Sequence, residues 1–129
     1  MRACILIIED DVPSLTLAKY LLEAAGHSTL AATDGLQGAT LAMTARVDLV
    51  MCDLHIPVMN GFEVLARLRS TRNWPRVPMI AVTASSMAGA REKILAAGFD
   101  GYISKPITPE TFVAQIEEFL ASNPPRDPT

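Results

Sequence analysis

Short apolar runs recur along this chain, and segments with helical periodicity separate them. Most of the runs lack the alternation of polar and apolar residues that marks a half-exposed strand, and they are too short for helices. They therefore predict short strands that are buried on both faces of a sheet. The predicted strands are residues 4–8, 29–32, 49–52, 79–82 and 101–103.

A predicted helix follows each strand. In the first, Leu15, Ala18 and Leu22 recur at helical spacing, and Gly26 ends the pattern. The other predicted helices are residues 36–44, the segment after Asn60, residues 88–97 and the segment after Thr108. Because strands alternate with helices, the chain predicts one α/β domain in which five βα units form a doubly wound parallel sheet.

Length, charge and hydropathy narrow the class of protein. A chain of 129 residues is expected to form one domain, and its net charge of −3 argues against nucleic-acid binding. No apolar run approaches the length of a membrane span, and the acids at 9–11 do not suit a signal peptide. Cys4 and Cys52 lie in apolar runs and are expected to be buried and unpaired. These features predict a cytoplasmic protein.

Polar side chains stand at the carboxyl ends of four predicted strands. They are Glu9, Asp10 and Asp11 after the first strand, Asp53 after the third, Thr83 after the fourth and Lys105 after the fifth. In an open parallel sheet these ends lie at one edge, where ligands bind. Glu9, Asp10 and Asp53 offer hard oxygen ligands, which suit Mg²⁺. The alternative for an acidic triplet in a loop is plain solvation.

Asp53 directly follows an apolar strand and is the candidate nucleophile. A carboxylate can form an aspartyl-phosphate if a metal ion and a cation offset the charge. Lys105 is predicted to contact the phosphoryl oxygens as a point charge, and Thr83 to donate a hydroxyl to them. A cis peptide before Pro106 would aim Lys105 inward, although base rates favour trans.

These residues resemble those of response-regulator receiver domains, also called CheY-like domains. The resemblance covers residues 3–121, and its strength lies in the order and spacing of the motifs. The matching segments are IIEDD at 7–11, MCDLHIPVMNG at 51–61, AVTA at 81–84 and GYISKP at 101–106. Residues 80–84 and 102–107 are also similar to single-domain regulators of the DivK kind and to receivers of hybrid histidine kinases.

The resemblance implies a phosphorelay switch, not an enzyme with its own substrate, and a strand order of 2-1-3-4-5. Asp53 would accept a phosphoryl group from a histidine kinase or a phosphotransfer protein. Glu9, Asp10, Asp53 and the backbone carbonyl of His55 would hold Mg²⁺. The domain would assist its own Mg²⁺-dependent phosphorylation and dephosphorylation.

The switch implied by the resemblance involves Thr83 and Tyr102. Thr83 would bond the phosphoryl group, and Tyr102 would turn into the vacated space. The surface built from the fourth helix, fifth strand and fifth helix would then bind a downstream protein, with Met87, Ala90, Gln115 and Glu118 among its residues. The simpler interpretation of Tyr102 is a half-buried tyrosine at the sheet edge.

Several positions leave questions open. Glu9 stands where the family often has Asp, and its longer side chain suits metal binding through water. His55 and Ser85 occupy positions that tune the lifetime of the phosphoryl group, so the lifetime is not predicted. The His55 side chain is expected at the exposed rim, because imidazole is a poor Mg²⁺ ligand. His27, beside Gly26, is expected at the surface.

Two other function classes fit less well. An aspartate-nucleophile phosphatase of the haloacid dehalogenase kind needs a second aspartate at position 55, which is His55 here. A flavodoxin-like flavin carrier needs a phosphate-binding loop rich in Ser, Thr and Gly after the first strand, where this chain has acids. The receiver is expected at residues 1–121, and residues 122–129 form a proline-rich tail or linker. It could be free-standing or part of a hybrid kinase or a longer regulator.

Overall fold

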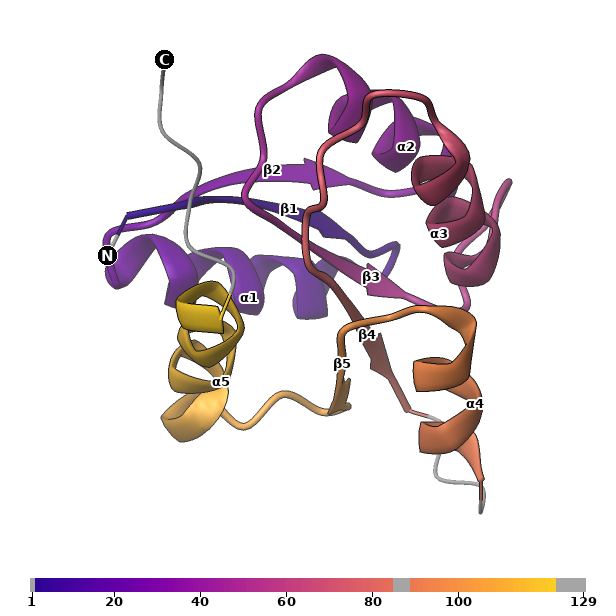
Figure 1. Cartoon of the computed structure of the whole chain (residues 1–129). Helices are drawn as coiled ribbons and strands as arrows, with labels where there is room; N and C mark the ends of the chain where they lie inside the picture. Colours follow the sequence, from indigo (N-terminus) through magenta and orange to yellow (C-terminus); the bar gives the residue numbers. More distant parts are fainter. Residues whose placement is uncertain (1, 85–88, 123–129) are drawn as a thin grey trace.

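Five parallel strands form one sheet in the order β2-β1-β3-β4-β5, as predicted (Figure 1). The structure is a computed structural model and describes residues 2–84 and 89–122. The strands are β1 (Cys4–Ile8), β2 (Ser28–Ala32), β3 (Leu49–Asp53), β4 (Met79–Thr83) and β5 (Gly101–Ser104). In the register, Ile8 lies opposite Cys52, Asp53 opposite Val82, and Thr83 opposite Ser104. The carboxyl ends of the central strands therefore meet at one edge.

Helices cover both faces of the sheet. They are α1 (Val12–Ala24), α2 (Gly35–Thr44), α3 (Gly61–Ser70), α4 (Ala90–Ala97) and α5 (Pro109–Ser122). Figure 1 shows α1 and α5 on one face and α2, α3 and α4 on the other. This arrangement confirms the predicted doubly wound α/β class.

The core is aliphatic and divides into two layers, one on each face of the sheet. The layer under α1 and α5 includes Leu22, Phe112 and Ile116, which are inaccessible to solvent. The layer under the other three helices includes Val64 and Leu68. Because β1, β3 and β4 contribute apolar side chains to both layers, their sequences show no alternation.

Local signals in the sequence set the ends of the helices. The Asp11 side chain accepts a hydrogen bond from the Ser14 N–H at 3.1 Å and caps α1. Asn60 and Glu63 form a reciprocal capping box at α3. Gly98 ends α4 with φ 117°, a left-handed conformation that favours glycine.

Expectations about the burial of two residues and the bounds of two helices need correction. His27 was expected at the surface but is buried, with 4% of its area exposed. Cys4 is only half-buried, whereas Cys52 is buried as predicted, and both are unpaired. A helix was expected from residue 88, but α4 begins at Ala90, because Gly89 is its N-cap with a left-handed φ of 85°. The last helix extends to residue 122, and residues 123–129 of the predicted tail lie outside the described residues. None of the described helices has the length and apolar character needed to cross a membrane.

Candidate functional site

Three carboxylates converge at the carboxyl edge of the sheet. One ligand atom from each of Glu9, Asp10 and Asp53 lies within 4.8 Å of the others. Glu9 and Asp53 are buried, whereas Asp10 is exposed to solvent. The predicted acidic cluster therefore forms, and its oxygen donors fit a small divalent cation such as Mg²⁺.

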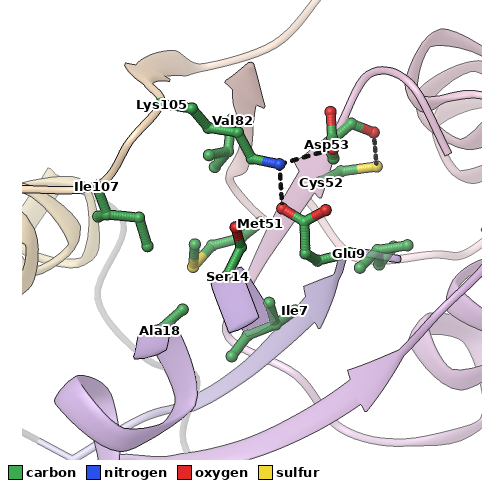
Figure 2. A pocket seen from close by; sticks show the side chains of 11 residues that line it. Ile7, Glu9, Ser14, Ala18, Met51, Cys52, Asp53, Val82, Lys105 and Ile107 are labelled. Atoms are coloured by element: carbon green, nitrogen blue, oxygen red, sulfur yellow. Dashed lines mark hydrogen bonds and ion pairs between the residues drawn. The ribbon is translucent and has the colours of Figure 1, made fainter. Parts of the chain in front are cut away.

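Lys105 is shared between two of these acids. Its Nζ lies 2.5 Å from Glu9 Oε1 and 2.9 Å from Asp53 Oδ2, as Figure 2 shows. The lysine directly follows β5, its N–H donates to the Thr83 carbonyl at 2.9 Å, and its peptide bond to Pro106 is cis. One cation thus serves two buried carboxylates, and the cluster keeps an excess of negative charge.

The loop after β3 fixes the orientation of Asp53. The His55 N–H donates to Asp53 Oδ1 at 3.1 Å, so both carboxylate oxygens are held. Gly61 lies against the backbone here, since a Cβ on it would stand 2.8 Å from the Asp53 carbonyl oxygen. A side chain at that position would displace the loop.

The pKa values of the two buried acids shift in opposite directions. Burial alone would raise the pKa of Asp53, but hydrogen bonds from Lys105 and from the His55 N–H outweigh it and hold that pKa below its ordinary value. Burial raises the pKa of Glu9, and the hydrogen bond from Lys105 only partly opposes this. Asp53 is therefore the carboxylate better kept ionised, as a nucleophile requires.

An apolar cavity lies directly behind the charged groups. Figure 2 shows Lys105 reaching over it toward Glu9 and Asp53. Its apolar lining includes Ile7, Ala18, Met51, Val82 and Ile107. The acids instead accept hydrogen bonds from Lys105, from the His55 N–H and, at Glu9 Oε2, from the Asp11 N–H at 3.2 Å.

The other predicted residues lie at or near this edge. Thr83 is fully buried at the end of β4, and the His55 side chain is exposed, as expected. Asp11 serves α1 as its cap, and its Oδ2 accepts hydrogen bonds from both the N–H and the hydroxyl of Ser14. Tyr102 and Ala90 are half-buried. Ser85 and Met87 lie outside the described residues.

Sequence reasoning missed one polar neighbour of the predicted switch residues. The Ser104 hydroxyl donates to the Tyr102 hydroxyl at 3.0 Å, and Ser104 pairs in register with Thr83. The signal was available, because residues 102 and 104 of a strand point to the same face.

Comparisons with known proteins agree with this geometry. The family model described as the response regulator receiver domain matches residues 5–117. The polar-differentiation response regulator DivK of Brucella anthropi is 36% identical over 120 residues, which cover 93% of this chain and 98% of that protein.

Solved structures give the same result. The receiver domain of a sensor histidine kinase from Pseudomonas aeruginosa PAO1 has a magnesium ion coordinated in its active site cleft. It superimposes with a TM-score of 0.84 at 29% identity, covering 94% of this chain and 99% of that one. The chemotaxis response regulator CheY4 of Vibrio cholerae superimposes with a TM-score of 0.86 at 27% identity, covering 93% and 100%.

Proposed function

The chain belongs to the response regulator receiver domain family, and on that premise we propose that Asp53 is the residue that accepts its phosphoryl group. The observation that carries the proposal is the position of Asp53. It is the carboxylate that lies at the end of a buried strand, bonds Lys105 and also stands beside Glu9 and Asp10.

The proposed reaction is phosphoryl transfer from phosphohistidine. One Asp53 oxygen forms a bond to phosphorus while the P–N bond breaks, and the electron pair returns to the imidazole nitrogen. Lys105 neutralises charge on the phosphoryl oxygens, and the His55 N–H keeps the Asp53 carboxylate oriented.

We assign a Mg²⁺ site to Glu9, Asp10, Asp53 and the His55 carbonyl. The magnesium-containing kinase receiver and the close grouping of the three carboxylates support this assignment. When bound, Mg²⁺ supplies Lewis-acid charge stabilisation at the phosphoryl oxygens.

Thr83 and Tyr102 are proposed as the switch residues. Thr83 stands at the carboxyl edge at the end of β4, and Tyr102 lies one strand away, bonded to Ser104. The surface of α4, β5 and α5 is proposed to bind a downstream protein. Glu118 is exposed there and Gln115 half-buried. A receiver that only relays phosphate to another protein is the alternative outcome.

The proposed donor of the phosphoryl group is a histidine kinase or a phosphotransfer protein in the cytoplasm. The similarity to DivK and to a kinase receiver supports this class of partner. In this proposal the chain acts as a phosphoacceptor switch and assists its own phosphorylation and dephosphorylation.

Labelling by acetyl phosphate in Mg²⁺ tests the assignment of Asp53. Asp53→Asn is expected to abolish labelling, because an amide oxygen is a poor nucleophile. Asp11→Asn is the matched control, since asparagine also caps helices and the Asp11 side chain is not part of the cluster of Glu9, Asp10 and Asp53. It is expected to label like the wild type. Stoichiometric labelling of the Asp53→Asn variant would show that another residue is the acceptor.

Beryllofluoride with Mg²⁺ tests the switch. Amide shifts measured by NMR are expected to extend from Asp53 to residues 83–90 and to Tyr102. Thr83→Ala is expected to reduce those distant shifts while acetyl phosphate still labels Asp53. Shifts confined to the loop after β3 would leave a relay without a switch.

A further inference from the structure

Three side chains with hydroxyl groups lie on one face of the sheet where β4 and β5 end. Thr83 ends β4, Ser104 ends β5, and the two residues pair in register. Tyr102 stands two residues before Ser104 on the same strand, so both side chains point to the same face. Tyr102 packs against the core layer under α2, α3 and α4, to which Ala81 of β4 also belongs. Because Thr83 stands two residues after Ala81, it points to this face too.

A hydrogen bond joins the hydroxyl groups of Ser104 and Tyr102. Ser104 Oγ donates to Tyr102 Oη at 3.0 Å, and Ser104 is exposed while Tyr102 is half-buried. A serine hydroxyl lies close to its own backbone, whereas a tyrosine hydroxyl stands at the far end of the ring. The bond therefore holds the tip of the Tyr102 ring beside residue 104, at the carboxyl end of β5 and next to the strand that carries Thr83.

The packed orientation of Tyr102 requires a partner for its hydroxyl. The ring lies against the core layer, and a tyrosine hydroxyl that leaves water without a hydrogen bond costs free energy. Ser104 offers such a bond from the same strand. A turn of the ring to another staggered χ1 angle would carry its tip away from residue 104, and the bond would break. The hydrogen bond therefore stabilises this orientation of Tyr102 over the others.

We propose that Ser104 is a positioning residue of the switch, and that its hydroxyl stabilises Tyr102 in the packed orientation. This inference rests on the proposed function, in which Thr83 bonds the phosphoryl group and Tyr102 turns into the space that Thr83 leaves. A tyrosine that turns inward carries its hydroxyl out of water, and Ser104 stands beside Thr83 with a hydroxyl to bond it. Ser104 acts through Tyr102 and has no part in the proposed Mg²⁺ site.

The size of the effect follows from the strength of one hydrogen bond. A bond between two neutral hydroxyl groups changes the equilibrium between two orientations of a side chain about fivefold. Ser104 is therefore expected to determine how completely Tyr102 adopts the packed orientation, and not whether Asp53 accepts phosphate. The simpler interpretation is an exposed serine for which water is an equally good partner, and the experiment separates the two.

Ser104→Thr and Ser104→Val form a matched pair, because threonine and valine have nearly the same shape and only threonine keeps a hydroxyl. Tetranitromethane nitrates tyrosine rings that turn to solvent, and mass spectrometry measures each ring separately. The chain has two tyrosines, and Tyr20, which is 68% exposed, is the internal reference. In Mg²⁺ and beryllofluoride, Ser104→Val is expected to raise the nitration rate of Tyr102 relative to Tyr20 about fivefold. Ser104→Thr is expected to stay within about twofold of the wild type.

A second measurement separates the hydrogen bond from a general effect of residue 104 on the fold. The amide shift of Ala90 that beryllofluoride induces is expected to be smaller in Ser104→Val than in Ser104→Thr. When each is combined with Tyr102→Phe, the two are expected to give equal shifts, because phenylalanine has no hydroxyl to bond. The same difference between valine and threonine with Phe at position 102 would overturn the proposal.

The remaining outcomes distinguish this inference from the function on which it rests. Equal nitration ratios in Ser104→Val and Ser104→Thr would overturn the positioning role of Ser104. Labelling of Asp53 by acetyl phosphate is expected to stay within about twofold in both variants, since their change acts on Tyr102. Failure of acetyl phosphate to label Asp53 in the wild type would instead count against the proposed function.

Discussion

Each edge of the sheet holds one largely buried aspartate with cationic partners, and the two aspartates differ in how far their charge is balanced. At the carboxyl edge, Asp53 shares Lys105 with Glu9. At the amino edge, Asp100 has two guanidinium partners to itself. An undercompensated aspartate gains from binding a cation, whereas a fully compensated one already has its partners. We expect this difference to separate the proposed phosphoacceptor site from a structural one.

The contacts of Asp100 explain its structural role. Arg69 Nη2 lies 2.9 Å and Arg76 Nη2 2.5 Å from its carboxylate, and the Met79 N–H donates to it at 2.8 Å. Arg69 also donates to the Val77 carbonyl at 2.8 Å. Asp100 therefore connects α3, the loop before β4, and the starts of β4 and β5.

Removing divalent cations is expected to have the largest effect, and only at the carboxyl edge. Without a cation, the excess carboxylates repel the incoming phosphate, so EDTA should lower labelling of Asp53 at least about a hundredfold. Asp10→Ala should weaken Mg²⁺ binding measured by calorimetry, while Asp100→Asn should leave it unchanged. Normal labelling rates in EDTA would contradict a metal-dependent site.

The free energy of unfolding should depend more on Asp100 than on Asp53, which is the reverse of the order expected for labelling. Asp100→Asn leaves Arg69 with an uncharged partner and is expected to lower the free energy of unfolding by about 2 kcal/mol. Asp53→Asn loses the charged hydrogen bonds from Lys105 and the His55 N–H but also the repulsion from Glu9, so it should lower the free energy of unfolding by less than about 1 kcal/mol. Urea unfolding measures both. A larger loss for Asp53→Asn would show that the carboxyl edge is the structural one.

The sequence predicts the carboxyl edge better than the amino edge. Asp53 and Lys105 each follow an apolar strand directly, so parallel topology alone brings them together. Asp100 meets its arginine partners across 31 and 24 residues, one in the last turn of α3 and one in the loop before β4. No local pattern encodes such pairs.

Two other residues escaped prediction for related reasons. His27 follows a helix-ending glycine, which is typical of surface positions, but the tertiary fold places α5 over it. Val58 has a positive φ of 74°, and the neighbouring Pro57 carbonyl accepts a hydrogen bond from the Gly35 N–H at the start of α2, a contact that the local sequence does not announce.

At acid pH, the contribution of Asp100 to the free energy of unfolding should become smaller. Burial alone would raise the pKa of Asp100, but hydrogen bonds from Arg76 and the Met79 N–H outweigh it and hold the pKa below its ordinary value of 3.8. A depressed folded pKa contributes stability that is present above 3.8 and is lost as the pH falls through the folded value.

The measurement is the free energy of unfolding between pH 7 and pH 3, for the wild type and for Asp100→Asn. The difference in free energy of unfolding between the wild type and Asp100→Asn is expected to stay constant down to about pH 4 and to become smaller at lower pH. A gap that stays constant down to pH 3 would mean that the carboxylate charge of Asp100 contributes nothing.

The smallest expected effects come from a second polar pair at the amino edge. His27 Nδ1 accepts the Ala3 N–H at 3.1 Å, so the ring proton lies on Nε2, which faces Glu117 Oε2 at 2.9 Å. This pair joins the starts of β1 and β2 to α5, and its histidine side chain is fully buried. Like the carboxylate of Asp100, the two ring nitrogens of His27 have their hydrogen-bond partners within the fold.

Removing the two partners of this pair should have unequal consequences. His27→Leu leaves the buried Ala3 N–H without an acceptor and should cost about 1 kcal/mol. Glu117→Gln keeps an oxygen acceptor on a side chain that is 38% exposed, so it should cost about 0.5 kcal/mol or less. Neither variant should change labelling of Asp53 by acetyl phosphate, because both residues lie at the edge away from the acids. Urea unfolding and labelling are measured on the same preparations. A change in labelling rate without a change in stability would mean that residues at the amino edge influence the reaction at Asp53. The two edges could then not be treated as separate sites.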